Sequence, residues 1–510
     1  MPKGTEIAYD CFKLDYPSEE KYVKENEGEV KVYYTDDGTL TIQGKNFALK
    51  LDERTGYFKS YRFDGQTIIN DYLKPNFWRA PTLNDEVDRH GSQVWKQAEL
   101  DNLKAERQAT KTTTLDDGRL QIHQTIHLKD AAGNLQIVVN QFYIISGDGE
   151  VAIATRAEMV GDVTYVPKVG LQMHLPKDLQ DLKYFGKDAE NYPDRNAAGS
   201  FGIFKSNALD NFEQHVVPQD NSNHSDVRWL AIESPKNPIG LFVTSSEPFN
   251  FSMYPYSDEI LTKAHRINQL EEADFLTLNV DALQSGLGTA TCGPDTDEKY
   301  LLNKKYYEYV VCLRPYPVGK QDPAELYHYA VPSFEKTFEA TPYVYPDYDR
   351  HIIKSTTFVN EPAPNYSQNK ETALMDGKKG IVGGYYWDNW LGFNGVDMET
   401  TIELTEPIDI KMVKIGVAHK PESWVPWPKG AWVSFSKDGK KFTEWKRAEF
   451  PAYDLPDPMQ SLGRLEARAK VNEKDVKFLK IKVENQGVLP KWHPNAGEKA
   501  WIMVDEITIE

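Results

Sequence analysis

Short runs that alternate between apolar and polar residues fill most of the chain from residue 31 to residue 312. Along residues 120–128 one parity is apolar, at Leu120, Ile122, Ile126 and Leu128. A period of two is typical of a half-buried strand. Asp-Gly pairs, which favour tight turns, begin at positions 37, 64, 117 and 148. Because no long amphipathic helix interrupts these runs, the pattern predicts a large antiparallel β-sandwich.

The composition of the sequence changes after residue 314, where prolines become frequent. We expect residues 315–349 to be a Pro-rich linker with one short helix. Asp322 can cap that helix, Pro323 suits its first position, and Glu325 can reach back to the cap amide. A second β pattern predicts another domain over residues 350–510.

Residues 1–30 do not fit either pattern. Residues 7–14 read as a lone strand, and a lone strand has no partner for its backbone groups. We therefore interpret residues 1–30 as the remnant of a preceding β-sandwich domain and a linker. Met1 is then an internal start or an artificial boundary.

Charge and composition exclude several classes of partner. The net charge of −18 disfavours nucleic acid and anionic membranes. No run approaches the roughly 18 apolar residues of a membrane span, so we expect no membrane insertion. The compartment stays open: periplasmic or secreted if a longer chain carries a signal peptide, otherwise cytoplasmic. Three free thiols are favoured over one disulfide for Cys11, Cys292 and Cys312.

Several separated motifs between residues 31 and 314 resemble, in order, one known family. These are Phe47–Leu49, Thr55–Phe58, Phe77–Asp85, Glu190–Arg195, Pro218–Asn221, Val227–Trp229, Asn279–Asp281 and Gly286–Gly288. They resemble the C-terminal β-sandwich, or small chain, of the β-galactosidases of glycoside hydrolase family 2. The resemblance implies an all-β, galactose-mutarotase-like supersandwich over residues 31–314.

The resemblance also implies what this chain lacks. In that family the two catalytic glutamates, and the Mg²⁺ and Na⁺ ions, lie on a barrel that precedes this segment. The chain would then be the non-barrel portion of a retaining β-galactosidase, inactive by itself. Its partners would be galactosides and the remainder of the same enzyme.

Two positions depart from the family pattern. The family usually has Asp where this chain has Leu83, and it often has a Trp near the position of Cys292. That indole stacks on the sugar, and aromatic stacking on an apolar sugar face is a common way to bind galactosides. A thiol cannot replace it, which puts substrate contact by this loop in doubt.

Charged residues in these motifs are candidates for substrate binding. They are Arg79, Glu190, Arg195, Arg228 and His265. The favoured alternative is that Arg–Asp pairs lock loops together, because charges deep in a domain must be paired. Catalysis by Glu190 and Asp194 is disfavoured, since retaining hydrolysis needs two carboxyls about 5–5.5 Å apart in one cleft. His215, His224 and Asp226 match no metal-binding pattern and are predicted to be surface loop residues.

The C-terminal region resembles the discoidin, or coagulation-factor C-type, jelly roll, a galactose-binding-like β-sandwich. The motifs are Thr372–Gly377, Trp390–Phe393, Ser434–Phe442 and Trp501–Ile507. The resemblance implies a structural Ca²⁺ held by Asp376 and Glu506, against a plain Asp-Gly turn as the alternative.

Tryptophans in this region are candidates for sugar binding. They are Trp387, Trp424, Trp427 and Trp492, of which Trp424 and Trp427 flank a Val-Pro pair that would hold their rings rigid. Packing of the same aromatic surface against the barrel carries equal weight.

Three functions therefore compete. The first is the non-barrel portion of a β-galactosidase-like hydrolase, which buttresses the barrel and contributes to galactoside binding. The second is a stand-alone, non-enzymatic carbohydrate-binding protein. The third is an autonomous mutarotase or lyase that uses the first sandwich.

Overall fold

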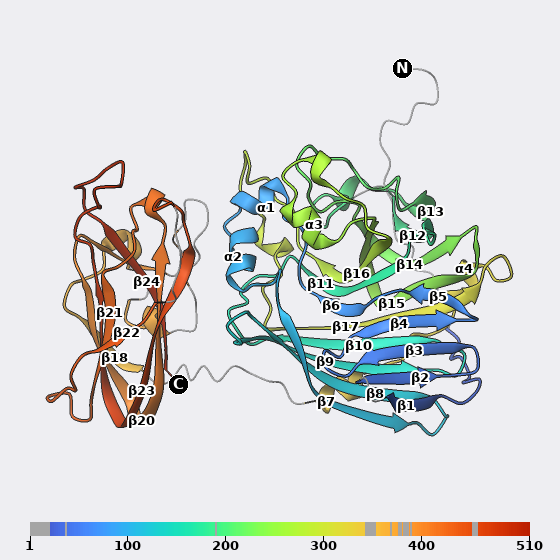
Figure 1. The fold of residues 1–510 in the computed structure, drawn as a ribbon, viewed down its shortest axis with the longest axis horizontal. Helices are drawn as coiled ribbons and strands as arrows, with labels where there is room; N and C mark the ends of the chain where they lie inside the picture. Colours follow the sequence, from blue (N-terminus) through green and yellow to red (C-terminus); the bar gives the residue numbers. More distant parts are fainter. Residues whose placement is uncertain are drawn as a thin grey trace, which may run out of the picture. The chain divides into compact units, whose positions relative to one another are not determined.

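The computed structural model describes residues 21–35, 38–188, 191–341, 353–367, 370–375, 380, 387, 390–450 and 457–509. The chain divides into two compact units, unit 1 with residues 1–345 and unit 2 with residues 346–510. Strands dominate both units, so the predicted all-β class is confirmed (Figure 1). The lone strand predicted at residues 7–14 lies outside the described residues.

Unit 1 contains the strands β1 to β17. Their bounds are β1 Lys31–Thr35, β2 Thr39–Gln43, β3 Phe47–Asp52, β4 Phe58–Phe63, β5 Gln66–Ile69, β6 Leu73–Asn76, β7 Lys104–Thr114, β8 Leu120–Lys129, β9 Leu135–Ile145, β10 Val151–Met159, β11 Lys168–Pro176, β12 Asp181–Lys187, β13 Phe201–Asn207, β14 His224–Ser234, β15 Asn237–Tyr254, β16 Phe275–Gln284 and β17 Tyr306–Pro317.

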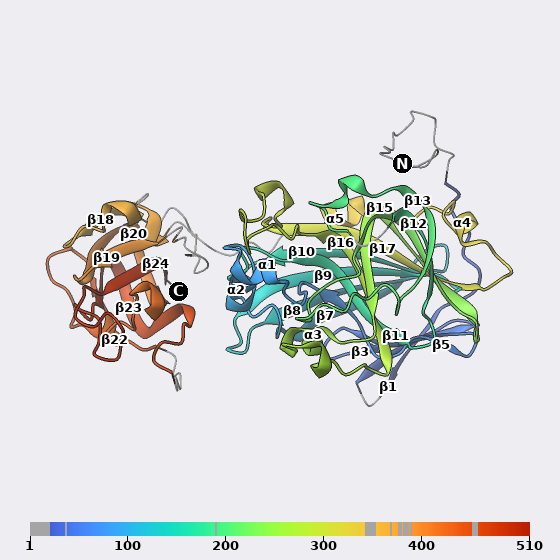
Figure 2. The same cartoon turned by 90° about the horizontal axis from the view of Figure 1, so that it is seen from above.

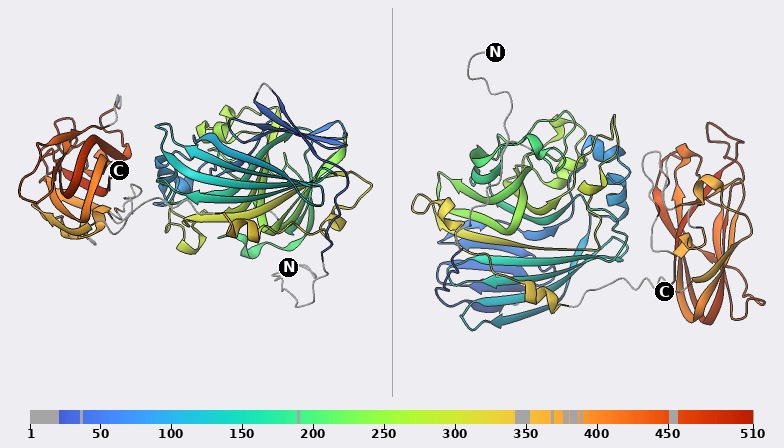
Figure 3. Two further views of the ribbon diagram at one scale, coloured as in Figure 1. Left: turned by 90° about the horizontal axis from the view of Figure 1, so that it is seen from below. Right: turned by 180° about the vertical axis from the view of Figure 1, so that it is seen from behind.

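Most of these strands pair antiparallel in two runs that share β15. One run is β1-β2-β3-β4-β6-β11-β16-β15, and the other is β7-β8-β9-β10-β17-β15. In addition, β13-β12-β14 join β15 through β14, and β5 pairs with β4. Residues 239–245 of β15 pair with β17, and residues 250–254 pair with β16. The strand thus passes from one run to the other, and the curled layers are seen from above in Figure 2 and from below in the left panel of Figure 3.

Burial along the strands follows the sequence pattern. Strand β8 alternates strictly between buried and half-buried residues, as its period of two predicts. Strands β10 and β11 are buried on both faces, so they form the centre of the unit. The glycines of the four Asp-Gly pairs all have positive φ, between 72° and 91°, which confirms the turns.

Short helices decorate unit 1. They are α1 Leu83–Val87, α2 Ser92–Gln97, α3 Asp258–Lys263, α4 Pro323–Leu326 and α5 Glu335–Glu339, with 3₁₀ turns η1 Asn196–Ala198, η2 Ile267–Gln269 and η3 Glu298–Tyr300. The predicted start of α4 is confirmed: the Asp322 side chain accepts a hydrogen bond from the amide of Ala324, 3.0 Å away, and Pro323 opens the helix.

The segment predicted as a linker is packed against unit 1 as far as residue 341. Arg314 donates to the carbonyl of Leu326, and Arg156 donates to the carbonyls of Phe338 and Thr341. Phe338 is buried against β9 and β10. Two arginines from the sheet therefore hold this segment as a strap, which the proline content alone did not indicate.

Unit 2 is a second antiparallel β structure. Its strands are β18 Ile353–Phe358, β19 Leu391–Asn394, β20 Met398–His419, β21 Gly430–Ser436, β22 Lys446–Ala448, β23 Gly463–Glu484 and β24 Trp501–Ile509, with turns η4 Pro364–Tyr366, η5 Ala373–Met375 and η6 Pro421–Ser423. The order is β19-β24-β20-β23-β21-β22, with β18 on β20. The discoidin assignment of this unit stays a prediction.

No helix in the described part of the chain has the length and apolar character needed to cross a membrane.

Candidate functional site

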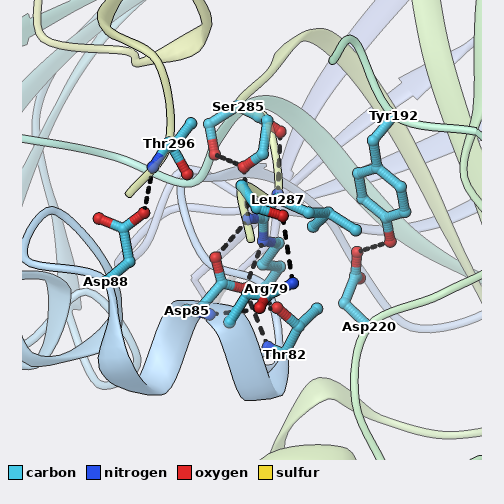
Figure 4. A network of polar contacts seen from close by, with 12 residues as sticks. Arg79, Thr82, Asp85, Asp88, Tyr192, Asp220, Ser285, Leu287 and Thr296 are labelled. Carbon is cyan, nitrogen blue, oxygen red and sulfur yellow. Dashed lines mark hydrogen bonds and ion pairs between the residues drawn. The ribbon is translucent and has the colours of Figure 1, made fainter. Parts of the chain in front are cut away.

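Arg79 joins two segments that lie about 200 positions apart. Its side chain is fully buried, and Nη2 lies 2.7 Å from a carboxylate oxygen of Asp85. The guanidinium also donates to the carbonyls of Ser285 and Gly286, at 3.1 and 3.2 Å (Figure 4). Burial opposes the charge, but Asp85 raises the pKa of Arg79, so the guanidinium stays protonated.

Asp85 is itself satisfied by the start of α1. Its carboxylate accepts from the amide and the hydroxyl of Thr82, at 2.8 and 2.9 Å, and the Thr82 hydroxyl accepts from the Asp85 amide. This is a capping box. The Arg79–Asp85 pair is therefore a buried ion pair whose remaining polar atoms are hydrogen-bonded, the condition under which such a pair is tolerated.

The segment 285–296, here called the clamped loop, receives further bonds from α1. Asn84 donates to the carbonyl of Gly288 and accepts from the amide and hydroxyl of Thr291. Asp88 accepts from the amide of Thr296 at 2.7 Å. The short helix α1 is thus the platform on which the clamped loop lies.

A third segment secures the clamped loop from the other side. The carboxylate of Asp194 accepts from the amides of Leu287 and Gly288, and Arg195 donates to the carbonyl of Gly288. Gly288 has φ of +61°, and a Cβ there would lie 2.5 Å from the Thr296 hydroxyl, so the position requires glycine.

The clamped loop ends in an exposed tip. Thr289, Thr291, Cys292, Gly293 and Pro294 are exposed. Beside the tip, Leu83 and Val87 lie four residues apart on α1 and are 51% and 44% exposed. The tip and α1 therefore form a surface of fixed backbone with exposed apolar side chains.

The structure brings together two of the five charged residues predicted to bind substrate. Arg79 and Arg195 both bond to the clamped loop, with Asp194, as loop-locking contacts. Arg228 lies elsewhere, over the Phe201 ring, and His265 is exposed before η2. Glu190 is outside the described residues. Substrate binding by these residues stays a prediction.

His224 corrects one expectation. The sequence predicted a surface loop residue, but its side chain is 3% exposed and its ring stacks on Phe251. Burial lowers the pKa of His224 to about 4, so the ring is neutral. His224 is the first residue of β14. The polar residues around it had suggested a loop, so the start of this strand was not predicted.

A buried charged pair, Lys168 with Asp281, lies at the centre of unit 1 and was not predicted. Both side chains are 0% exposed, and Nζ lies 3.4 Å from Oδ2. Nearby, Asp220 accepts a hydrogen bond from the Tyr192 hydroxyl at 2.6 Å. Burial raises the pKa of Asp281 to about 7, although Lys168 opposes this. No spacing in the sequence signals this pair, because its members come from two strands 113 positions apart.

The tryptophans of unit 2 differ in exposure. Trp492 is 42% exposed, whereas Trp427 packs edge-on against His419 and Phe450. Trp387 packs edge-on against Trp390, and Trp424 has a left-handed backbone with φ of 65°. Of the four, Trp492 has the most open ring, and sugar binding by the set stays a prediction.

Of the two residues predicted to bind calcium, the structure describes one. Glu506 is 4% exposed in β24, and Asp376 lies outside the described residues. Among the described residues no group of three His, Cys, Asp or Glu side chains is arranged to hold a metal ion. Cys292 and Cys312 are free thiols, as expected, and Cys11 is outside the described part.

We expect Asp194→Ala to loosen the clamped loop without unfolding unit 1. The change leaves two partly buried amides without their acceptor, which costs about 1–3 kcal/mol locally. Hydrogen exchange of the Leu287 and Gly288 amides should then accelerate. Asp297→Ala, whose carboxylate is 61% exposed, is the matched control and should leave both amides unchanged. Equal exchange in the two variants would contradict the role given to Asp194.

Unit 1 is thus an all-β domain that holds one surface loop in place with buried charges. Residues 43–313, a little more than half of the chain, match the family described as Beta galactosidase small chain, and the chain belongs to that family. The resemblance predicted from the motifs of unit 1 is confirmed.

Known relatives and structures cover parts of the chain. A beta-galactosidase of Actinobacillus pleuropneumoniae is 28% identical over 274 residues, 53% of this chain and 26% of that protein. One of Vibrio cholerae is 27% identical over 289 residues, 55% of this chain and 27% of that protein. The chain spans about a quarter of the length of these relatives. A crystal structure of a putative aldose 1-epimerase from Escherichia coli K12 aligns with 57% of this chain and 100% of that chain, at 11% identity and a TM-score of 0.34.

Proposed function

We propose that this chain is the non-barrel portion of a β-galactosidase, and that unit 1 supports the catalytic barrel of the same enzyme. Family membership supports the relation to β-galactosidases. The observation that carries the finer proposal is the clamped loop, which residues of this chain itself hold in place: Arg79, Asn84, Asp88 and Asp194.

A loop fixed in this way is suited to contact a second domain. Ordering a loop during association costs free energy, and a loop that is already held avoids that cost. The exposed apolar residues of α1 offer an interface beside the tip, because exposed apolar side chains gather at protein contacts. In this proposal the tip forms one wall of the galactoside site. Its backbone and threonine hydroxyls act there in place of an indole.

Hydrolysis itself would reside on the barrel. A retaining glycosidase needs an acid and a nucleophilic carboxylate about 5–5.5 Å apart. In the clamped site, Asp85 is paired with Arg79, and both oxygens of Asp194 face backbone amides. These carboxylates are therefore engaged in holding the loop, which agrees with an inactive isolated chain.

The test compares nitrophenyl β-galactoside hydrolysis by this chain alone with hydrolysis by the chain together with the barrel-bearing remainder of its enzyme. We expect no turnover by the chain alone and turnover when the two parts are combined. Val87→Asp should weaken their association at least about tenfold, as expected for a charge introduced into an interface.

The matched control is Ile203→Asp, which changes a β-branched side chain of similar exposure, 54%, on β13 of unit 1. It should leave association unchanged. Turnover by the chain alone would overturn the assignment of catalysis to the barrel. Full activity of the barrel without this chain would overturn the supporting role.

A further inference from the structure

Unit 1 contains a pocket of about 660 Å³ between β6, β11 and α3. We call it the β6–β11 pocket, after two paired strands that contribute lining residues and that lie side by side in Figure 1. This volume lies within the range of small-molecule sites, roughly 300–1,000 Å³. The pocket is separate from the clamped loop, since none of its lining residues belongs to the segment 285–296.

His174 lines this pocket and has a buried ring nitrogen without a partner. The side chain is 5% exposed, its ring stacks on Phe275, and Nδ1 lies 3.3 Å from the carboxylate of Asp71. Nε2 has no hydrogen-bond partner within the described structure. Burial lowers the pKa of His174 to about 4, so the ring is neutral at physiological pH. A buried polar atom without a partner is costly, which makes it a candidate contact for a bound molecule.

Lys74 adds a donor on the adjacent strand. Its ammonium lies 4.7 Å from the centroid of the Tyr72 ring, and it forms no ion pair with any carboxylate that the structure describes. Burial lowers the pKa of Lys74, while Asp258 and Asp71 oppose the shift. An amine in such a position gains from hydrogen-bond acceptors that a ligand brings into the pocket.

The remaining polar groups are held in fixed orientations. Gln172 donates to Asp258 at 2.7 Å and accepts from the Tyr72 hydroxyl at 2.9 Å. Asp258 also accepts from the Tyr254 hydroxyl, and each of its oxygens keeps a further lone pair. Trp78 is anchored through its indole N–H to Thr262. Donor, acceptors and aromatic rings thus line the pocket in a rigid arrangement.

We propose that the β6–β11 pocket binds a neutral pyranose sugar. Both signs of charge line it, so a charged ligand would meet like charges as well as opposite ones. The charged residues of the lining are Lys74, Lys263, Asp101, Asp258 and Glu259. A sugar offers hydroxyls that both donate and accept, which matches Lys74, Asp258 and Nε2 of His174. Its apolar face can lie on the half-buried ring of Tyr72. This inference goes beyond the proposed function and does not depend on it.

The experiment is calorimetric titration of the full chain with D-galactose, D-glucose, lactose and D-galacturonate at pH 7. We expect saturable binding of at least one neutral sugar and no tighter binding of galacturonate. His174→Gln and Lys74→Met should each weaken that binding at least about tenfold, the loss of a hydrogen bond to a ligand. Asn102→Trp changes an exposed residue of the rim and should block the pocket if the buried variants fold poorly.

Two control variants separate this pocket from other sites. His123→Gln is matched to His174→Gln, because His123 also stacks on a ring, that of Phe142, and its Nε2 also lacks a partner, but it lies outside the pocket. Trp492→Ala removes the exposed indole of unit 2 and any sugar binding that depends on it, so the titrations of the pocket variants are repeated in this background. His123→Gln should bind sugar like the unchanged chain. The proposal is overturned by absence of saturable binding, by unchanged binding in Asn102→Trp, or by tighter binding of galacturonate. None of these outcomes bears on association with the barrel.

Discussion

Replacing Arg79 with methionine is expected to lower the free energy of unfolding of unit 1 by about 3–5 kcal/mol, the cost of leaving one member of a buried ion pair alone. The carboxylate of Asp85 would lose its ion-pair partner at a site that is 4% exposed, and the carbonyls of Ser285 and Gly286 would lose their donor. The measurement is denaturant unfolding of the full chain, followed by a signal assigned to unit 1.

Arg79→Lys should recover little of this loss. An ammonium cannot reproduce the planar fork that reaches the carboxylate and two carbonyls at once. The control is Lys263→Met, which breaks an ion pair with Glu259 whose side chains are both 74% exposed. Such pairs contribute at most about 0.5 kcal/mol, so the control should unfold like the unchanged chain. A loss below 1 kcal/mol in Arg79→Met would show that Asp85 can reach water.

Local order was predictable from the sequence where neighbouring residues determine it. The period of two in residues 120–128 gave the strand β8, and the Asp-Gly pairs gave turns with positive φ. Asp322 followed by proline gave the start of α4. Each of these features depends on side chains within a few positions of one another, so it can be predicted from a short stretch of sequence.

Contacts between distant segments were not predictable in the same way. The motifs identified Arg79 and Arg195 as charges that need partners, but they did not indicate that both would bond to the clamped loop. A Thr-x-x-Asp pattern at residues 82–85 is a capping-box signal and could have revealed α1. The strap was predicted to be a linker because its prolines can be read from the sequence. The arginines that hold it belong to distant strands, so these contacts could not be read in the same way.

The buried pair at the centre of unit 1 should make stability depend on pH. Asp281 has a pKa of about 7 in the folded protein, raised by burial, against about 3.9 in an unfolded chain. Between these values the folded protein keeps a proton that the unfolded chain has lost. Unfolding is then favoured as pH rises from 4 to 7, by about 4 kcal/mol in total. The measurement is the free energy of unfolding of the unchanged chain and of Asp281→Asn across this range.

The difference between the two chains isolates Asp281, because Asp220 and Lys168 are present in both. Asparagine cannot ionise, so its variant should lack this fall in stability. Lys168→Met provides a second check. The ammonium of Lys168 lowers the pKa of Asp281 against the effect of burial, and its removal should move the fall to higher pH. If the free energies of unfolding of the unchanged chain and of Asp281→Asn vary in parallel with pH, the prediction is contradicted. Water would then reach the pair, and burial would not raise the pKa of Asp281.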